Sequence, residues 1–146
     1  MRISRGLWAL TIIVILSPSL ASATAVDKLL HLEKSVLSEY TGEQLFKAAL
    51  QSYVCSFLMH LSGQIPKAQH LCSHSVRLME EDSVTAFGKN WNDVNFPGAL
   101  AAWELADKYM KRFGISQKAA AGRLLIDGPQ CKVLNELVES EIADPD

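Results

Sequence analysis

The sequence lacks the local motifs that identify most enzymes and nucleic-acid-binding proteins. It has no glycine-rich phosphate-binding loop, and none of its serines lies in a G-x-S-x-G stretch. Its 14 lysines and arginines form no cluster, whereas a nucleic-acid-binding domain needs a basic face. Strand-like alternation of apolar and polar residues is also missing. We therefore expect a helical protein that is not an enzyme, needs no cofactor and binds no nucleic acid.

Long apolar runs are equally scarce, and the only one lies near the N-terminus. Arg2 and Arg5 precede ten almost wholly apolar residues at 7–16, and small residues follow at 21–23 (Ala-Ser-Ala). A basic start, a short apolar run and an A-x-A end are the three parts of a secretory signal peptide. A membrane-spanning helix needs about 20 apolar residues, so an uncleaved anchor is the weaker interpretation. The pattern predicts cleavage directly after this triplet, with a second site two residues later.

Export would leave a single domain of 123 residues, 24–146, which is long enough to bury a hydrophobic core. Removal of residues 1–23 takes two arginines with it and changes the net charge from −2 to −4. No later apolar run approaches membrane-spanning length. We therefore expect a periplasmic or secreted protein that stays off the membrane once its signal is removed. Its mildly acidic surface would suit a basic protein partner.

Cysteine is rare, with only Cys55, Cys72 and Cys131 in the chain. An odd number in an exported protein predicts one disulfide and one remaining thiol. Cys72 lies on the apolar stripe of its predicted helix, and Cys131 follows a Gly-Pro break after which the final helix can turn back. We therefore predict a disulfide between Cys72 and Cys131, with Cys55 buried and reduced inside an apolar helix.

Apolar residues recur at helical spacing along the rest of the chain, which indicates an all-α bundle of five or six helices. Thr41 and Gln44 form the capping-box pattern of a helix start, and Gly63 is a typical residue just after a helix end. The helix between them is apolar on more than one face, so we expect it to be central. The predicted helices cover residues 26–40, 41–62, 66–81, 97–113, 116–126 and 131–142.

The predicted helix 97–113 has its large apolar side chains on one face. We predict that this face packs in the core of the bundle, Trp103 included. The residues that form the face are Leu100, Trp103, Ala106, Met110 and Phe113.

Three histidines and a cysteine lie near one another in the sequence: His60, His70, Cys72 and His74. His70 and His74 are four residues apart and can share one helix face, as two zinc ligands do. Cys72, however, lies about 200° around that helix from His70 and points away from both histidines. The glutamate of an H-E-x-x-H motif is also missing. We therefore predict no metal site here.

Residues 80–98 form the longest stretch without clean helical periodicity, and many of them favour turns. Trp91 stands there among polar side chains. Either it folds back onto the core and fixes a loop, or it anchors a protein interface, where tryptophan is enriched. We predict a loop or short helix that carries partner recognition. The predicted contact residues are Asn90, Trp91, Asn92 and Asp93.

Several stretches resemble parts of the immunity proteins of type VI secretion amidase effectors. Residues 51–57 (QSYVCSF) look like the tyrosine- and cysteine-bearing early helix of these proteins. Residues 100–131 are similar to their amphipathic helix, short alanine-rich helix and following cysteine, and residues 70–72 (HLC) match the start of their middle region. The resemblance implies a helical periplasmic protein that binds and occludes a peptidoglycan amidase, often as a dimer. It also permits Cys55–Cys131 as the alternative disulfide.

These observations predict a non-catalytic periplasmic protein that neutralises a cell-wall amidase toxin by occluding its active site. The alternative function is that of a small helical periplasmic chaperone or secretion accessory protein. A chaperone would bind its clients through an exposed apolar surface.

Overall fold

The computed structural model describes residues 20–143, which form eight helices and no strand. The helices are α2 (Leu20–His31), α3 (Lys34–Leu37), α4 (Gly42–Leu61), α5 (Ile65–Met79), α6 (Asp82–Ala86), α7 (Trp91–Phe113), α8 (Gln117–Asp127) and α9 (Pro129–Ala143). The predicted all-α fold with one disulfide is confirmed. There are more helices than the predicted five or six because α3 and α6 are short helices within the connections.

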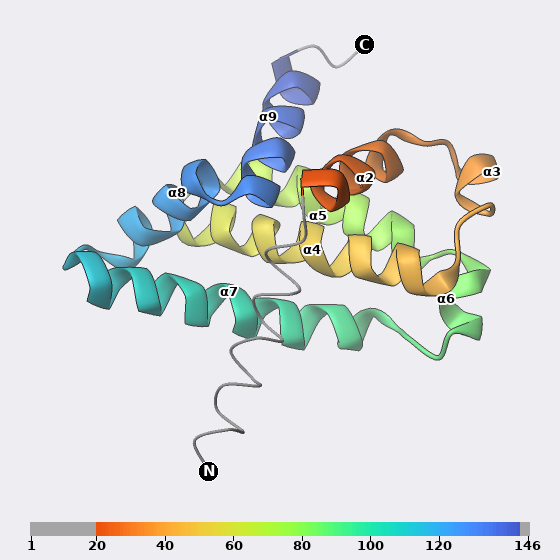
Figure 1. Cartoon of the computed structure of the whole chain (residues 1–146), viewed down its shortest axis with the longest axis horizontal. Helices are drawn as coiled ribbons and strands as arrows, with labels where there is room; N and C mark the ends of the chain where they lie inside the picture. The colour runs from red at the N-terminus through yellow and green to blue at the C-terminus, as the bar shows by residue number, and fades with distance from the viewer. Residues whose placement is uncertain (1–19, 144–146) are drawn as a thin grey trace.

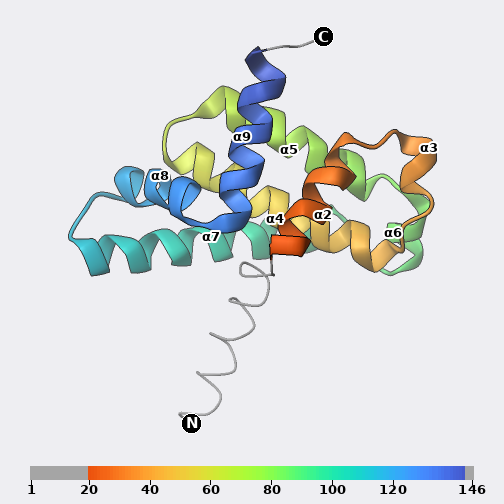
Figure 2. The same cartoon turned by 45° about the horizontal axis from the view of Figure 1, so that its top comes forward.

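Helix α4 forms the centre of the bundle, as predicted. At its start, the side chains of Thr41 and Gln44 each accept a hydrogen bond from the other's backbone N–H. The helix packs against α5, α7 and α8 and also contacts α2, α6 and α9. In Figure 1 it crosses the middle of the molecule, with α7 along the lower edge. Figure 2 shows α2 and α9 side by side over α4. Its many neighbours explain why α4 is apolar on more than one face.

The single helix predicted for residues 26–40 is wrong, because the chain bends within it. Helix α2 ends at His31, and the backbone of Glu33 is extended before α3 begins. Beyond the bend, Leu37 is fully buried in the same core as Leu30. The apolar periodicity continues through the bend, which is why the sequence pattern does not reveal it.

Helix α7 begins at Trp91, whereas the sequence predicted a start near Pro97. Asn90 is its N-cap, and Asp93 completes a capping box with it. The cap starts the helix upstream of Pro97, which therefore lies inside it. The predicted irregular segment 80–98 is thus the short helix α6, a turn and the first part of α7.

The predicted core face of α7 is wrong in three of its five members, because Leu100, Trp103 and Phe113 are exposed. Gly98, Ala102 and Ala106 are buried against the bundle, while Trp103 is 51% exposed. A Cβ atom at Gly98 would lie 2.5 Å from the Tyr53 ring on α4. The absence of a side chain at Gly98 lets the two helices approach closely, and helical geometry then places Leu100 and Trp103 on the outer side of α7.

The disulfide joins Cys55 to Cys131, so the predicted Cys72–Cys131 pairing is wrong and the alternative is confirmed. The Cα atoms of the two residues are 5.3 Å apart, which ties α4 to the first turn of α9. Cys72 is a partly buried free thiol on α5. The buried face of α5 is centred on Leu71, Ser75 and Leu78, and Cys72 lies at its margin, where no second cysteine meets it.

The predicted signal peptide lies almost wholly outside the described residues. Helix α2 begins at Leu20, and among its residues from Ala25 onward the buried side chains are Val26, Leu29 and Leu30. Cleavage at either predicted site would therefore keep all three of these core residues. Among residues 20–143, no helix combines the length and the apolar character that crossing a membrane requires.

Candidate functional site

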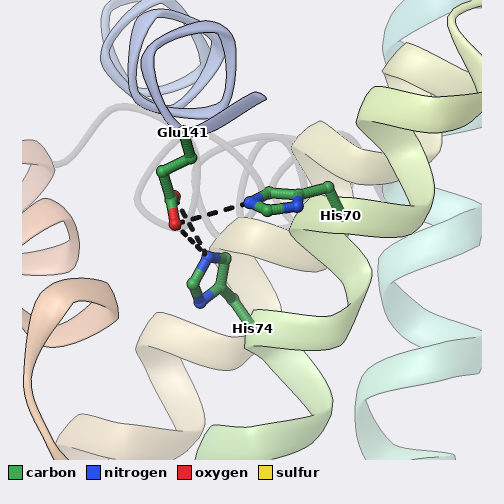
Figure 3. Close-up of side chains that lie close together, drawn as sticks. All are labelled: His70, His74 and Glu141. Atoms are coloured by element: carbon green, nitrogen blue, oxygen red, sulfur yellow. Dashed lines mark hydrogen bonds and ion pairs between the residues drawn. The ribbon is translucent and has the colours of Figure 1, made fainter. Parts of the chain in front are cut away.

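His70, His74 and Glu141 meet between α5 and α9 (Figure 3). The two histidines lie one helical turn apart on α5, and Glu141 reaches them from the last turn of α9. Residues i and i+4 of a helix share one face, so both imidazole rings are directed at the same carboxylate. We call these three residues the His-His-Glu cluster.

The atoms of the His-His-Glu cluster lie within contact distance of one another. The Nε2 atom of His74 lies 3.1 and 3.2 Å from the two carboxylate oxygens of Glu141. The Nε2 atom of His70 lies 3.4 Å from one of them. The side chain of His74 is only 10% exposed, against 34% for His70 and 25% for Glu141. The cluster is therefore buried on the His74 side and open to solvent on the other.

The electrostatics favour neutral histidine at the buried end of the cluster. Burial lowers the pKa of His74; the Glu141 carboxylate opposes this shift, and the Arg77 guanidinium reinforces it. His74 is therefore neutral at neutral pH, and its contact with Glu141 is a hydrogen bond rather than an ion pair. The Nε2 atom of His70 is buried, and its 3.4 Å contact with Glu141 is not a hydrogen bond, so it has no hydrogen-bond partner among the described residues. One buried nitrogen of the cluster is thus left unsatisfied.

Sequence reasoning missed the cluster because Glu141 is 67 residues from His74. One signal was available: Glu141 continues the apolar stripe of α9 that includes Leu134 and Val138. A carboxylate on a buried stripe needs a polar partner. His60, which the sequence placed near the other histidines, is exposed at the end of α4, where its ring contacts Phe57.

The predicted partner-binding residues Asn90, Asn92 and Asp93 are occupied in starting α7. The Asn90 side chain accepts a hydrogen bond from the Asn92 backbone N–H at 2.9 Å, and the Asp93 carboxylate accepts one from the Asn90 N–H at 2.9 Å. These bonds satisfy backbone groups that the start of a helix leaves unpaired. Capping therefore accounts for Asn90 and Asp93, and a role in partner binding stays a prediction.

Trp91 is half-buried and packs against the core, as the fold-back interpretation expects. Its ring meets that of Tyr53 edge to face, with the centroids 5.3 Å apart. It also lines an open groove of about 410 Å³ with side chains that include Val76, Met79 and Thr85. Trp91 thus supports the packing of α7 on α4, and only part of its surface faces solvent.

Large apolar side chains are exposed on the outer face of α7. Phe96, Leu100 and Trp103 are 75, 58 and 51% exposed, and we call them the apolar ridge. Each residue advances about 100° around a helix, so the three lie within about 60° of one another. The same geometry places them on the side opposite the buried Val94 and Ala102. The apolar periodicity of the sequence does not reveal this surface, because it places Leu100 and Trp103 in the core.

Comparisons with protein-family models, with curated proteins and with solved structures find no match to this chain. The resemblance to amidase immunity proteins therefore stays a prediction from the sequence. The His-His-Glu cluster is defined by the contacts between its residues, and the apolar ridge is defined by the exposure of its side chains.

Proposed function

We propose that the protein is an exported, non-catalytic inhibitor that binds a peptidoglycan amidase and covers its active site. The observation that carries the proposal is the apolar ridge. Phe96, Leu100 and Trp103 follow one another at spacings of four and three residues, so they form a continuous strip along two turns of α7. Single exposed apolar residues are common, whereas a strip of three large ones is typical of a binding surface.

The ridge has the chemistry of an interface centre. Tryptophan and other aromatic side chains dominate binding energy when a partner buries them, and an amphipathic helix face fits a groove on another protein. Acidic Glu104 and Asp107 follow the ridge along α7, and Asp107 forms an ion pair with Lys111 at 2.8 Å. With a net charge of −4 after signal removal, the protein as a whole suits a basic partner.

The scaffold holds the ridge rigidly, which favours tight binding. The capping box fixes the start of α7, and Gly98 lets the helix pack tightly against Tyr53. The Tyr53 hydroxyl donates a hydrogen bond to Asn95 at 2.6 Å, which adds a polar contact between α4 and α7. A preformed surface loses little conformational entropy when it binds.

The identity of the partner rests on the resemblance to amidase immunity proteins, which also implies a periplasmic location and a dimer. An intramolecular disulfide is compatible with export, because such bonds persist in oxidising compartments. The ridge is a helix face of the kind that fills a cleft, and filling the cleft of an amidase would keep peptidoglycan out of it.

Capture from a bacterial periplasmic extract tests the proposal. The immobilised protein is compared with the double variant Leu100→Glu/Trp103→Glu, and each captured protein is assayed for release of peptides from purified peptidoglycan. We expect the wild type to capture an amidase and inhibit it, and the variant to do neither. The proposal is contradicted if no amidase is captured, or if the variant inhibits it as well as the wild type does.

The apolar ridge also favours the alternative function, a periplasmic chaperone, because exposed apolar side chains bind unfolded chains. The two functions differ in selectivity. A chaperone would slow the aggregation of a reduced, unfolded test protein such as α-lactalbumin, and the ridge variant would lose this effect. An inhibitor would leave that aggregation unchanged.

A further inference from the structure

We propose that His70, His74 and Glu141 form a binding site for a divalent transition-metal ion, with Zn²⁺ as its best-fitting occupant. The site lies between α5 and α9, on residues that the proposed inhibitor function does not use. Two imidazole nitrogens and one carboxylate are a ligand set that zinc takes in proteins.

The spacing of the ligand atoms fits a metal ion. A tetrahedral zinc ion with bonds of about 2.0–2.1 Å holds its ligand atoms about 3.3 Å apart. The distances from Glu141 oxygens to the Nε2 atoms of His74 and His70 are 3.1 and 3.4 Å. No two of the three ligand atoms lie more than 4.8 Å apart. Small rotations of the two histidine side chains would therefore complete the geometry without moving either helix.

The hydrogen bonds within the cluster leave one buried nitrogen atom that a metal ion could bind. His74 bonds to Glu141, whereas the buried Nε2 atom of His70 has no hydrogen-bond partner among the described residues. A buried polar atom without a partner is unfavourable, and a metal–nitrogen bond would satisfy it. Binding requires both Nε2 atoms to present a lone pair, so each neutral imidazole would carry its single proton on Nδ1.

The ligand atoms and neighbouring charges of the cluster determine which metal ions it can bind. Glu141 is the carboxylate that faces both histidines, while Arg77 lies close enough to His74 to influence its charge. The Arg77 guanidinium donates a hydrogen bond to the Leu30 carbonyl at the end of α2. A site with one carboxylate and two imidazoles suits zinc, copper or nickel better than calcium or magnesium, which prefer oxygen ligands.

The partial exposure of the cluster provides an entry path. The side chains of His70 and Glu141 are 34 and 25% exposed. With three protein ligands, a tetrahedral ion keeps one position for water, as in open zinc sites. We therefore expect an exchangeable ion rather than a structural one that the fold needs.

Calorimetric titration with ZnCl₂ near neutral pH tests the site on the protein expressed from the 146-residue sequence. We expect one ion per chain, and affinity at least about 100-fold lower in His74→Ala and Glu141→Gln, since even residues outside the ligand set of a metal site change affinity 10–100-fold. The matched controls are Glu139→Gln, a nearby exposed carboxylate of α9, and His60→Ala. Both controls should bind zinc like the wild type.

The His70→Ala variant tests the site with less disturbance of the fold than His74→Ala, because His70 is the more exposed of the two histidines. Circular dichroism shows whether each variant keeps its helices. Zinc should raise the Tm of the wild type and of both controls but not that of His70→Ala, since only a ligand that binds the folded state stabilises it. The proposal is overturned if the wild type binds no zinc, or if the folded His70→Ala variant binds zinc as tightly as the wild type does.

Discussion

At the residue scale, the disulfide between Cys55 and Cys131 is the strongest single constraint on the bundle. It joins residues 76 positions apart, and the loop-entropy model gives a stabilisation of about 4.5 kcal/mol for a loop of that length. Cys131 is also 95% buried, so its sulfur packs in the core as well as forming the bond. The bond therefore acts together with the burial of Leu134 and Val138 to hold helix α9, which carries Glu141, against the bundle.

Substitution of single cysteines should separate the bonded pair from the free thiol. Cys131→Ser removes the disulfide and should lower the free energy of unfolding by about 2–5 kcal/mol. Cys72→Ser changes only a partly buried thiol and should cost less than about 1 kcal/mol. Urea denaturation measures both changes. A peptide linked through Cys72 in a non-reducing map of the wild type would contradict the assignment.

Truncation should cost stability at only one of the two tryptophans of α7. Trp91→Ala removes a half-buried ring that packs on Tyr53, and it should lower the free energy of unfolding by about 2 kcal/mol. Trp103→Ala removes an exposed ring and should change it by less than about 0.5 kcal/mol. Equal losses of stability in thermal denaturation would show that the exposures of the two rings are misassigned.

At the scale of the elements, caps and periodicity predict the helices that local sequence determines. The capping box at Thr41 and the stop at Gly63 mark α4, and α5, α8 and α9 also lie close to their predicted positions. The start of α7 was predictable from its own capping box, Asn90 with Asp93, but Pro97 suggested a later start. Its inner face was not predictable from apolar periodicity, because the neighbours of Gly98 are set by tertiary packing.

The close approach of α7 to α4 gives a matched pair of glycine substitutions. Gly98→Ala would place a Cβ atom 2.5 Å from the Tyr53 ring, and the resulting overpacking should cost about 1–3 kcal/mol. Gly122→Ala on α8 meets no atom within 4 Å and should stabilise the protein by about 0.5–1 kcal/mol, because alanine favours a helix. The Tm measured by thermal denaturation should therefore fall for Gly98→Ala and rise for Gly122→Ala. A higher Tm for Gly98→Ala would contradict the tight packing.

At the scale of the whole molecule, the two candidate surfaces lie apart on the bundle. The apolar ridge is on α7, along the lower edge in Figure 1, whereas the His-His-Glu cluster joins α5 to α9 on the other side of α4. Sequence reasoning paired His70 with His74 but predicted no metal site, because Glu141 comes from a distant segment. It missed the ridge because it placed Leu100 and Trp103 in the core. Substitutions in the cluster should therefore abolish zinc binding without affecting amidase inhibition, and substitutions in the ridge should do the reverse.

The dissociation constant of the complex with the captured amidase tests the central claim most directly. Trp103→Ala should raise it at least about thirtyfold, which corresponds to about 2 kcal/mol, while leaving the Tm nearly unchanged. Lys132→Ala, at an exposed position of α9 away from the ridge, should leave the constant within about threefold of the wild type. An unchanged constant for Trp103→Ala, with a large increase for Asn92→Ala, would contradict the account and place the interface at residues 90–93.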